Sequence, residues 1–398
     1  MTSGPPFPTV EPSLLEQRVW DVAVVGAGPA GAMVAHDLAR EGCSVVLLDR
    51  REFPRWKVCG ACLSPGAQSA LQSAGLGDLP SDLGASPLEV LRLRGWSIQA
   101  DIPLKGSLAV SRSALDHALV RAARARGAVF SPLSRTRFEG VTGEMAQLNV
   151  DLPGGVARLR ARLVVAADGL GSPTLAQSGN GAVSSPAAPS DKLGLGAVFE
   201  GEDPGFAEGA IHMALGEDGY AGLVRTECGR LNVAAAVNRS ALGRGNSPGE
   251  VVAHLLREAS FPPLQGRPVE GWKGTPSLSH HPERLGGERV FAVGDAAGYV
   301  EPFTGEGMSW ALSGARTLAP IAHRALRGWT DQHLLEWEES YRRTVGKAQR
   351  VCRLIAWTLG RPRLSKATLR LLDRFPLFAD PFVAKAASPP PSILERTT

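Results

Sequence analysis

The chain has 398 residues, of which 43% are hydrophobic and 21% are charged, and its formal net charge at pH 7 is +4. This composition is typical of a globular protein with a large core, long enough for two or three domains, and the small net charge does not indicate a nucleic-acid-binding protein. Five cysteines are few for this length, which indicates a reducing compartment rather than a disulfide scaffold.

The N-terminal residues 1–19 are predicted to form a disordered leader, because Pro and Gly are frequent in them. They contain no basic segment followed by an apolar run, so we expect no signal peptide. No apolar stretch reaches the roughly 18–20 residues of a membrane span. We therefore expect a cytoplasmic protein, and peripheral contact with a membrane surface is the one membrane association left open.

The first nucleotide-binding signal lies between two short apolar runs of the buried-strand type, residues 21–25 and 45–48. Between them a GxGxxG motif, formed by Gly26, Gly28 and Gly31, opens a segment of helical composition. The first glycine permits a tight turn, the second lets a pyrophosphate approach the backbone, and the third lets the helix pack against the sheet. Asp49 ends the second strand, where a carboxylate can accept hydrogen bonds from ribose hydroxyls. The pattern predicts a dinucleotide-binding unit.

Two further apolar runs end in similar signals. Residues 161–167 lead into Asp168-Gly169, and residues 290–293 lead into Gly294-Asp295. A loop from Pro302 to Gly307 then precedes a helix that is expected to extend to about residue 326. Glycine recurs at positions 294, 298, 305 and 307, which an ordinary strand-turn-helix does not require.

In this order the three signals resemble the FAD motifs of the glutathione reductase type-two flavoproteins, a group that holds aromatic hydroxylases, flavin halogenases and geranylgeranyl reductases. The resemblance implies an α/β fold: a Rossmann-like FAD-binding domain of the para-hydroxybenzoate hydroxylase type, an inserted antiparallel-sheet substrate domain and C-terminal helices. It also implies that Asp295 contacts the ribityl chain of FAD and that the loop ending at Gly307 directs backbone N–H groups at the N1–C2 edge of the flavin. Arg112, at the start of an amphipathic helix capped by Ser111 or Ser113, would reach the FAD; a solvated arginine is the alternative.

The domain division follows from where the strand-helix rhythm stops. Residues 77–106 and 190–282 show short alternating runs separated by Gly-rich turns, which is typical of an antiparallel sheet. We predict that these two segments form the substrate domain. The remaining predicted parts are an FAD-binding domain of residues 20–76, 107–189 and 283–330, a C-terminal helical region of residues 331–388, and a disordered tail of residues 389–398.

The loop FPRWKVCGACLSPGA, residues 53–67, places Cys59 and Cys62 three positions apart. A zinc site needs three or four ligands, and the neighbouring pair His280-His281 cannot easily complete one, so we predict no metal. The loop resembles the Pro-Arg-x-Lys-x-Cys-Gly segment of geranylgeranyl reductases, with matches at Pro54, Arg55, Lys57, Cys59 and Gly60. The resemblance implies that Cys59 lies beside the flavin and matters for double-bond reduction. A Cys59–Cys62 redox disulfide remains the alternative.

A second comparison with the reductases concerns Tyr220. Many of them carry a Tyr-x-Trp-x-Phe-Pro stretch that lines the substrate cavity, and here Gly222 stands at the tryptophan position and Arg225 at the proline position. We expect a roomier pocket with a cation at its rim. Tyr220 is predicted either to line this pocket as a catalytic residue or to be a core tyrosine with its hydroxyl at the edge.

The predicted site residues fall into two classes, catalytic and cofactor-binding. The predicted catalytic residues are Cys59 and Tyr220. The predicted cofactor-binding residues are Gly26, Gly28, Ala30, Gly31, Asp49, Arg50, Lys57, Cys59, Gly60, Ala61, Arg112, Asp168, Gly169, Gly294, Asp295, Pro302, Gly305, Glu306, Gly307 and Met308.

The C-terminal region is strongly basic. Residues 342–387 contain eleven Lys or Arg residues against two acids, and apolar residues recur at helical spacing, as at Val351, Leu354 and Ile355. A packed helical cap with a solvated basic side is the interpretation we favour. The alternative is a basic amphipathic face that lies on anionic lipid, which would suit an isoprenoid substrate.

The resemblance implies an FAD-dependent oxidoreductase that transfers a hydride from flavin N5 to a carbon–carbon double bond of an isoprenoid or polyketide-derived substrate, with NAD(P)H as the electron donor. A monooxygenase acting on a hydrophobic or aromatic substrate is the first alternative, because one fold serves both reactions. A non-catalytic flavin-binding protein is the second. A halogenase is disfavoured, because no two of the eight tryptophans have the Trp-x-Trp spacing of those enzymes.

Overall fold

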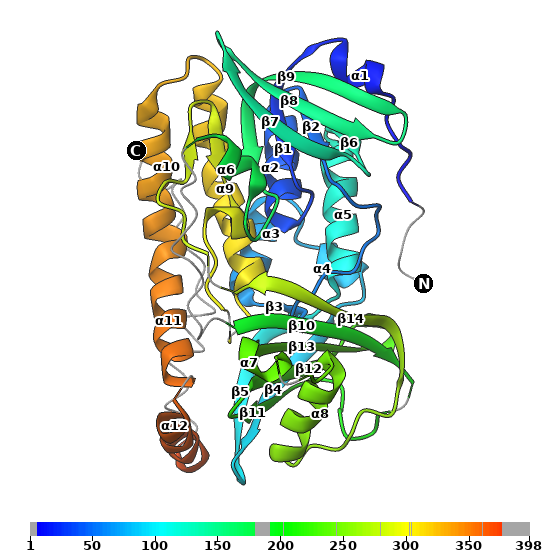
Figure 1. The fold of residues 1–398 in the computed structure, drawn as a ribbon, viewed down its shortest axis with the longest axis vertical. Helices are drawn as coiled ribbons and strands as arrows, with labels where there is room; N and C mark the ends of the chain where they lie inside the picture. The colour runs from blue at the N-terminus through cyan, green and yellow to red at the C-terminus, as the bar shows by residue number, and fades with distance from the viewer. Residues whose placement is uncertain are drawn as a thin grey trace.

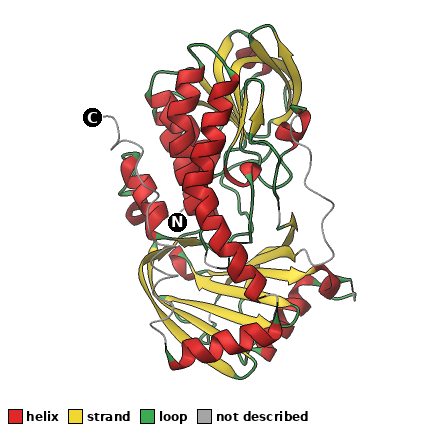
Figure 2. Cartoon of the chain, turned by 90° about the vertical axis from the view of Figure 1, so that its left-hand side faces the viewer, coloured by secondary structure: helices red, strands yellow, loops and turns green. Residues whose placement is uncertain are grey.

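The computed structural model describes residues 6–179, 192–201, 203–243, 245–278, 280–301, 303, 305–359 and 361–375. Two eight-stranded sheets lie one above the other along the long axis of the molecule (Figure 1). Figure 2 shows the two groups of strands at opposite ends of this axis, with a column of helices along one side. The predicted α/β fold with an added antiparallel-sheet layer is confirmed.

The upper sheet, sheet A, has the strand order β15-β16-β9-β1-β2-β6, and β8 and β7 continue from β9 as an antiparallel extension. Its strands are β1 (Val19–Val25), β2 (Val45–Leu48), β6 (Val129–Ser131), β7 (Arg135–Thr142), β8 (Met145–Leu152), β9 (Gly155–Ala166), β15 (Gly286–Gly287) and β16 (Val290–Ala292). β16, β9, β1, β2 and β6 pair in parallel.

The central strands of sheet A are buried on both faces. All four residues of β2 are fully buried, as expected for a short continuous apolar run in a parallel sheet. One face packs against the helices α2 (Pro29–Arg40), α5 (Arg112–Ala125) and α9 (Gly307–Ala325), and the other against the β7–β9 layer. Since the parallel strands all end at one edge, Gly26, Asp49, Asp168 and Gly294 are brought to that edge.

The lower sheet, sheet B, has the order β14-β10-β13-β12-β11-β4-β5-β3. Its strands are β3 (Cys62–Leu63), β4 (Ser86–Gly95), β5 (Ile98–Ala109), β10 (Lys192–Glu200), β11 (Ala210–Gly216), β12 (Gly219–Arg225), β13 (Leu231–Asn238) and β14 (Arg267–Ser277). All pairs are antiparallel except β11 with β4, where the two inserted segments meet in parallel. β5 extends past residue 106 and β3 lies before residue 77, so the sheet also uses residues outside the predicted substrate domain. The domain division stays a prediction.

Helices complete the two layers. α8 (Pro248–Glu258) packs on the outer face of sheet B, and its first turn is fixed by a capping box of Ser247 and Glu250. α10 (Asp331–Tyr341), α11 (Lys347–Leu359) and α12 (Pro362–Arg374) descend along one side, and α12 lies against β5 (Figure 1). Four shorter helices are α3 (Pro65–Ser73), α4 (Leu79–Asp82), α6 (Pro173–Gln177) and α7 (Arg239–Leu242).

The described part of the predicted disordered leader is ordered, so that prediction is wrong for residues 6–19. α1 (Pro12–Glu16) starts with proline at its first position, and Leu15 beneath it is fully buried. Phe7 stacks on His117 with 4.6 Å between ring centroids. Two buried apolar side chains, Phe7 and Leu15, therefore anchor this Pro-rich segment to the core. The predicted tail, residues 389–398, lies outside the described residues, and none of the described helices is long and apolar enough to cross a membrane.

Candidate active site

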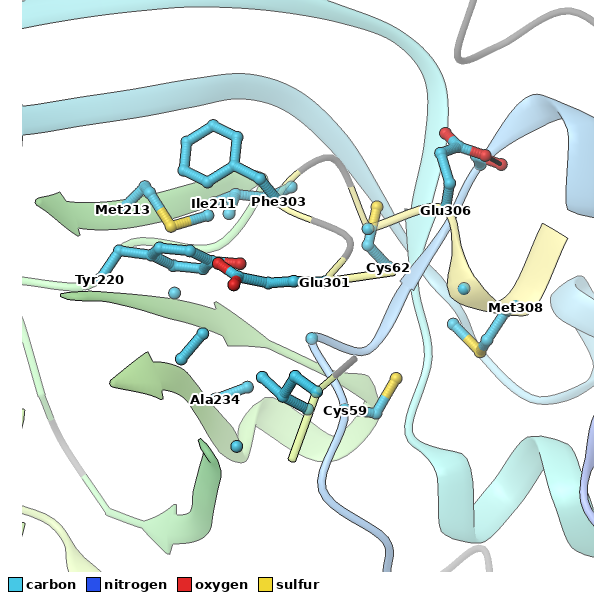
Figure 3. Close-up of a pocket in the computed structure, with 18 of the residues that line it drawn as sticks. Cys59, Cys62, Ile211, Met213, Tyr220, Ala234, Glu301, Phe303, Glu306 and Met308 are labelled. Carbon is cyan, nitrogen blue, oxygen red and sulfur yellow. Dashed lines mark hydrogen bonds between the residues drawn. The ribbon is translucent and has the colours of Figure 1, made fainter. Parts of the chain in front are cut away.

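A cavity of about 600 Å³ lies between the carboxyl edge of sheet A and the inner face of sheet B. One end is lined by the glycine-rich turns of sheet A, and the other by apolar side chains of sheet B and of α11 and α12. Figure 3 shows the middle of this cavity, with Cys59, Cys62, Glu306 and Met308 on one side and Met213, Tyr220, Glu301 and Phe303 on the other.

The glycine-rich end has the shape that a diphosphate requires. Gly26 has a φ of +103°, and a Cβ there would lie 2.3 Å from the carbonyl oxygen of Ala167. A Cβ on Gly31 would lie 1.9 Å from the carbonyl oxygen of Gly26, so this glycine lets α2 pack on the turn. A Cβ on Gly28 would lie 3.5 Å from a guanidinium nitrogen of Arg112 and 3.9 Å from one of Arg55. Gly28 therefore leaves an open space that two cations face at the N-terminus of α2.

The two guanidinium groups are held in place by buried acids. Arg112 makes a bidentate contact of 2.8 Å per bond with Asp116, one helical turn further along α5. Arg55 contacts the same carboxylate at 3.1 Å and Asp49 at 3.4 Å. Burial opposes the charge of Arg112, but the contact with Asp116 outweighs it and raises the pKa of Arg112 above its usual value. Arg112 is 8% exposed, which rules out the solvated alternative.

Replacing Arg112 by glutamine is expected to weaken FAD binding by about 10–100-fold, because a hydrogen bond to a charged group contributes roughly 1.5–3 kcal/mol. Titration of FAD into the apoprotein, followed by flavin fluorescence, measures the dissociation constant. Arg121 lies exposed on the same helix, so the Arg121→Gln variant is the matched control. Equal affinities for the two variants would contradict a phosphate-binding position for Arg112.

Asp49 is buried at the end of β2. One of its oxygens accepts a hydrogen bond from the N–H of Ala27 at 2.9 Å, and the other accepts one from the N–H of Arg51 at 2.9 Å. Both bonds pin the carboxylate between the first turn and the second strand, where a ribose hydroxyl can add a further bond. Arg50, its neighbour, is exposed.

The opposite side of the glycine-rich end is built around Asp295. Lys57 faces this carboxylate at 3.6 Å, and Gly294 and Gly305 both have positive φ values, +65° and +77°. A Cβ on Gly305 would lie 3.1 Å from the Cβ of Cys62, so only glycine brings the loop this close to β3. Pro302 lies outside the described residues.

Glu306 is a buried acid at the start of α9. It is 4% exposed and accepts a hydrogen bond of 3.0 Å from the hydroxyl of Ser64. Burial raises the pKa of Glu306 to about 7, although hydrogen bonds from Ser64 and Ser309 oppose the shift. This carboxyl group is therefore half-protonated near neutral pH in the wall of the cavity.

Both cysteines of the loop line the cavity as free thiols. Burial raises the pKa of Cys62 to about 12, and the nearby Glu306 acts in the same direction, so Cys62 is an unreactive thiol. Cys59 is half-buried, and Asn232 of β13 donates a 2.8 Å hydrogen bond to its carbonyl oxygen. Sheet B thus fixes the loop that carries Cys59. No group of three or more His, Cys, Asp or Glu residues in the described part of the chain is arranged to hold a metal ion.

The apolar end contains one polar cluster. The carboxylate of Glu301 lies beside the hydroxyl of Tyr220, and Lys192 forms a 2.8 Å ion pair with the same carboxylate. The Lys192 ammonium lies 5.0 Å from the centre of the Tyr220 ring. Burial raises the pKa of Tyr220 well above 10, and the charge of Glu301 acts in the same direction. Tyr220 therefore keeps its proton inside a mostly apolar wall (Figure 3).

The expected cation at the pocket rim is absent at position 225. Arg225 donates to the carbonyl oxygens of Asp203, Phe206 and Gly229 at 2.6–3.0 Å and does not line the cavity. That prediction is wrong because strand alternation and a nearby loop turn the guanidinium away. Gly222 does line the cavity and leaves room beside Met213, as expected for a roomier pocket.

The cavity brings together most of the predicted residues. Its wall contains Gly28, Ala30, Lys57, Cys59, Gly60, Arg112, Gly169, Tyr220, Gly294, Asp295, Gly305, Glu306, Gly307 and Met308. Gly26, Gly31, Asp49, Arg50, Ala61 and Asp168 do not line it. Asp168 uses both carboxylate oxygens locally, for Ser172 and for the N–H of Thr174 at the start of α6. Cofactor contacts of the individual residues remain predictions.

Sequence reasoning missed five polar residues of this region. Asp116 could have been found from its spacing of four from Arg112, and Glu301 from its place directly before Pro302. The other three, Ser64, Lys192 and Asn232, gave no local signal, because their partners are 242, 109 and 173 residues away.

Comparison with known proteins agrees with this geometry. A family model described as an FAD binding domain matches residues 19–352. The digeranylgeranylglycerophospholipid reductase 1 of Methanopyrus kandleri is 30% identical over 84% of this chain and 90% of its own. The menaquinone reductase of Mycolicibacterium smegmatis is 28% identical over 87% of this chain and 86% of its own. The chain belongs to the FAD-binding family, in the group of the geranylgeranyl reductases.

Two other similarities are more limited. The conditioned medium factor receptor 1 of Dictyostelium discoideum is 28% identical over 77% of this chain, and this chain spans only 64% of that protein. The solved structure of a halogenase in complex with phloroglucinol and FAD has a TM-score of 0.73 and 16% identity, covering 92% of this chain and 85% of the other, and thus shares the fold. FAD as the cofactor and an oxidoreductase activity are confirmed; the electron donor stays a prediction.

Proposed function

We propose that the protein is an FAD-dependent reductase that saturates a carbon–carbon double bond in an apolar substrate carrying an isoprenoid chain. The observation that carries the proposal is the continuity of the cavity, which joins the dinucleotide site of sheet A to an apolar chamber on the inner face of sheet B. The names of two relatives, a digeranylgeranylglycerophospholipid reductase and a menaquinone reductase, support an isoprenoid-bearing substrate.

The residues divide the work between holding FAD and enclosing the substrate. Gly28, Arg112 and Arg55 would hold the diphosphate, and Gly305 and Gly307 would present backbone N–H groups to the flavin. When bound, the flavin supplies the hydride, and NAD(P)H is the donor we propose for its reduction. The apolar walls exclude water from the reacting carbons.

Two residues that line this cavity, Tyr220 and Cys59, are the ones we propose to act on the substrate. Tyr220 keeps its phenolic proton, and Glu301, which is paired with Lys192, lies beside the hydroxyl. Cys59 lies on the loop that borders the dinucleotide end. We propose that these groups orient the substrate and supply the proton that completes the reduction.

The test is anaerobic turnover of a small panel of isoprenoid and polyketide compounds with the FAD-loaded enzyme and NADPH or NADH. A product heavier by the mass of two hydrogens supports the reductase. A product that forms only in air and has gained one oxygen atom would establish the monooxygenase alternative, which the halogenase-like fold allows. No product in either condition overturns the choice of substrate.

Substituting Gly222 with tryptophan is expected to lower kcat/KM at least about 100-fold by filling the chamber, while FAD content stays unchanged. The Gly222→Ala variant is the control, because its Cβ would lie 3.3 Å from the flexible end of Met213 and 3.8 Å, an ordinary contact distance, from the carbonyl oxygen of Ala234. Steady-state kinetics and the flavin absorbance of the purified variants give both quantities. Normal kinetics of the tryptophan variant would place the substrate elsewhere.

A further inference from the structure

The last two helices expose an unusual amount of apolar surface. Ten large apolar side chains are exposed in the described part of the chain, and five of them lie between residues 354 and 375. We call these five the C-terminal apolar surface: Leu354, Trp357, Leu364, Leu371 and Phe375. Their exposed fractions range from 39% to 59%. Exposed apolar residues gathered in so short a segment indicate a contact surface rather than chance exposure.

The same segment is strongly basic. Residues 347–375 contain eight Lys or Arg residues and one acid, Asp373, whereas the whole chain has 43 basic and 39 acidic residues. Basic residues before it behave differently, because Arg342 and Arg343 both pair with Glu339 on α10. The described part of the chain offers no carboxylate partner to the cations of α11 and α12. Their charge is therefore available to an anionic surface.

The inner side of these helices forms part of the cavity wall. Ile355, Leu369 and Leu372 line the cavity, and Ser365 and Leu369 are buried. Leu354 and Leu371 line the cavity and are also exposed, at 59% and 46%. The apolar wall of the cavity thus continues to the outer surface between α11 and α12, at the lower end of the helical column in Figure 1.

We propose that the C-terminal apolar surface docks on an anionic lipid bilayer and that a lipid-dissolved substrate enters the cavity between α11 and α12. The apolar side chains would enter the acyl boundary, and the flanking arginines and lysine would contact the lipid phosphates. Both interpretations of the basic tail then apply, because one face is packed and the other faces lipid. Substrate access between the helices rests on the proposed function, but the docking does not.

The experiment compares binding of the full-length FAD-loaded protein to two kinds of vesicle by co-sedimentation. One is phosphatidylcholine alone, and the other contains equal parts of phosphatidylcholine and phosphatidylglycerol. The charge variant is Arg363→Gln/Lys366→Gln/Arg370→Gln, and the apolar variant is Leu354→Ser/Leu371→Ser. The control variant is Val156→Ser/Leu335→Ser, which removes exposed apolar residues at 62% and 50% exposure elsewhere on the molecule.

The wild type and the control are expected to bind the anionic vesicles, and added salt should weaken the binding. The charge variant should bind about 100-fold more weakly, since each cation near an anionic surface contributes roughly a factor of five. The apolar variant should also lose binding, with flavin content and thermal unfolding unchanged. Failure of the wild type to prefer anionic vesicles, or equal binding by all variants, would overturn the proposal.

Two other occupants of this surface predict different results. A second copy of the chain would appear as a concentration-dependent dimer in analytical ultracentrifugation, abolished by Leu354→Ser/Leu371→Ser. The chain's own residues 376–398 would block vesicle binding altogether. Either result overturns lipid docking but leaves the reductase intact, whereas normal docking without turnover would count against the proposed function alone.

Discussion

Replacing Gly31 by alanine is expected to abolish FAD binding and to destabilise the protein by about 3 kcal/mol or more. The added Cβ would lie 1.9 Å from the carbonyl oxygen of Gly26 and 3.0 Å from the Cβ of Ala167. The first of these atoms belongs to the main chain, so relief requires moving α2 away from the turn that forms the diphosphate space. Flavin absorbance after purification and urea unfolding measure the two effects.

The control for this substitution is Gly328→Ala. Gly328 follows α9 and needs no positive φ, and a Cβ added to it would meet no described atom within 4 Å. Its alanine variant should match the wild type in both measurements. A Gly31→Ala protein that binds FAD fully and is as stable as the wild type would contradict the prediction that the turn cannot accommodate a Cβ at position 31.

The second large effect concerns Glu306 and pH. Burial raises the pKa of Glu306 from the usual 4.5 to about 7, so the folded protein binds a proton that the unfolded chain has released over this interval. The stability associated with that proton is fully present below pH 4.5 and is lost as the pH rises through 7. The shift corresponds to about 3 kcal/mol at most.

Glu306→Gln should therefore flatten the pH dependence. Glutamine stays neutral, so we expect the variant to resemble the wild type near pH 5 and to be more stable than the wild type near pH 8, as read from urea unfolding at both values. The exposed Glu144 supplies the control variant, Glu144→Gln, which should keep the wild-type slope. Parallel curves for wild type and Glu306→Gln would mean that the carboxyl group is solvated.

The elements predicted most accurately are those with purely local causes. β2 covers residues 45–48 as predicted, because a run of four apolar residues that begins with two valines is typical of a short strand buried on both faces. Ser111 caps α5 by accepting a hydrogen bond from the N–H of Ala114, one of the two caps expected. Gly26 and Gly31 have the close approaches that their motif implies.

What could not be predicted depends on contacts between distant segments. Lys192 and Glu301 come from different layers, and nothing near either residue indicates the other. The parallel pairing of β4 with β11 joins two strands more than a hundred residues apart in the chain. The prediction that Arg225 places a cation at the pocket rim failed for the same reason. The carbonyl oxygens of Asp203 and Phe206, which accept hydrogen bonds from Arg225, belong to a loop that sequence alone does not position.

The dispersed origin of the cavity wall has a consequence for synthesis of the protein. Its glycine-rich end is lined by Gly28 and Arg112 from the first third of the chain, and also by residues between Gly294 and Met308 from the last third. A ribosome-bound chain that lacks α9 cannot yet close the binding site. We therefore expect FAD to bind only after the ribosome has synthesised and released nearly the whole chain. The yellow colour of bound FAD would then indicate a chain that has been synthesised through α9.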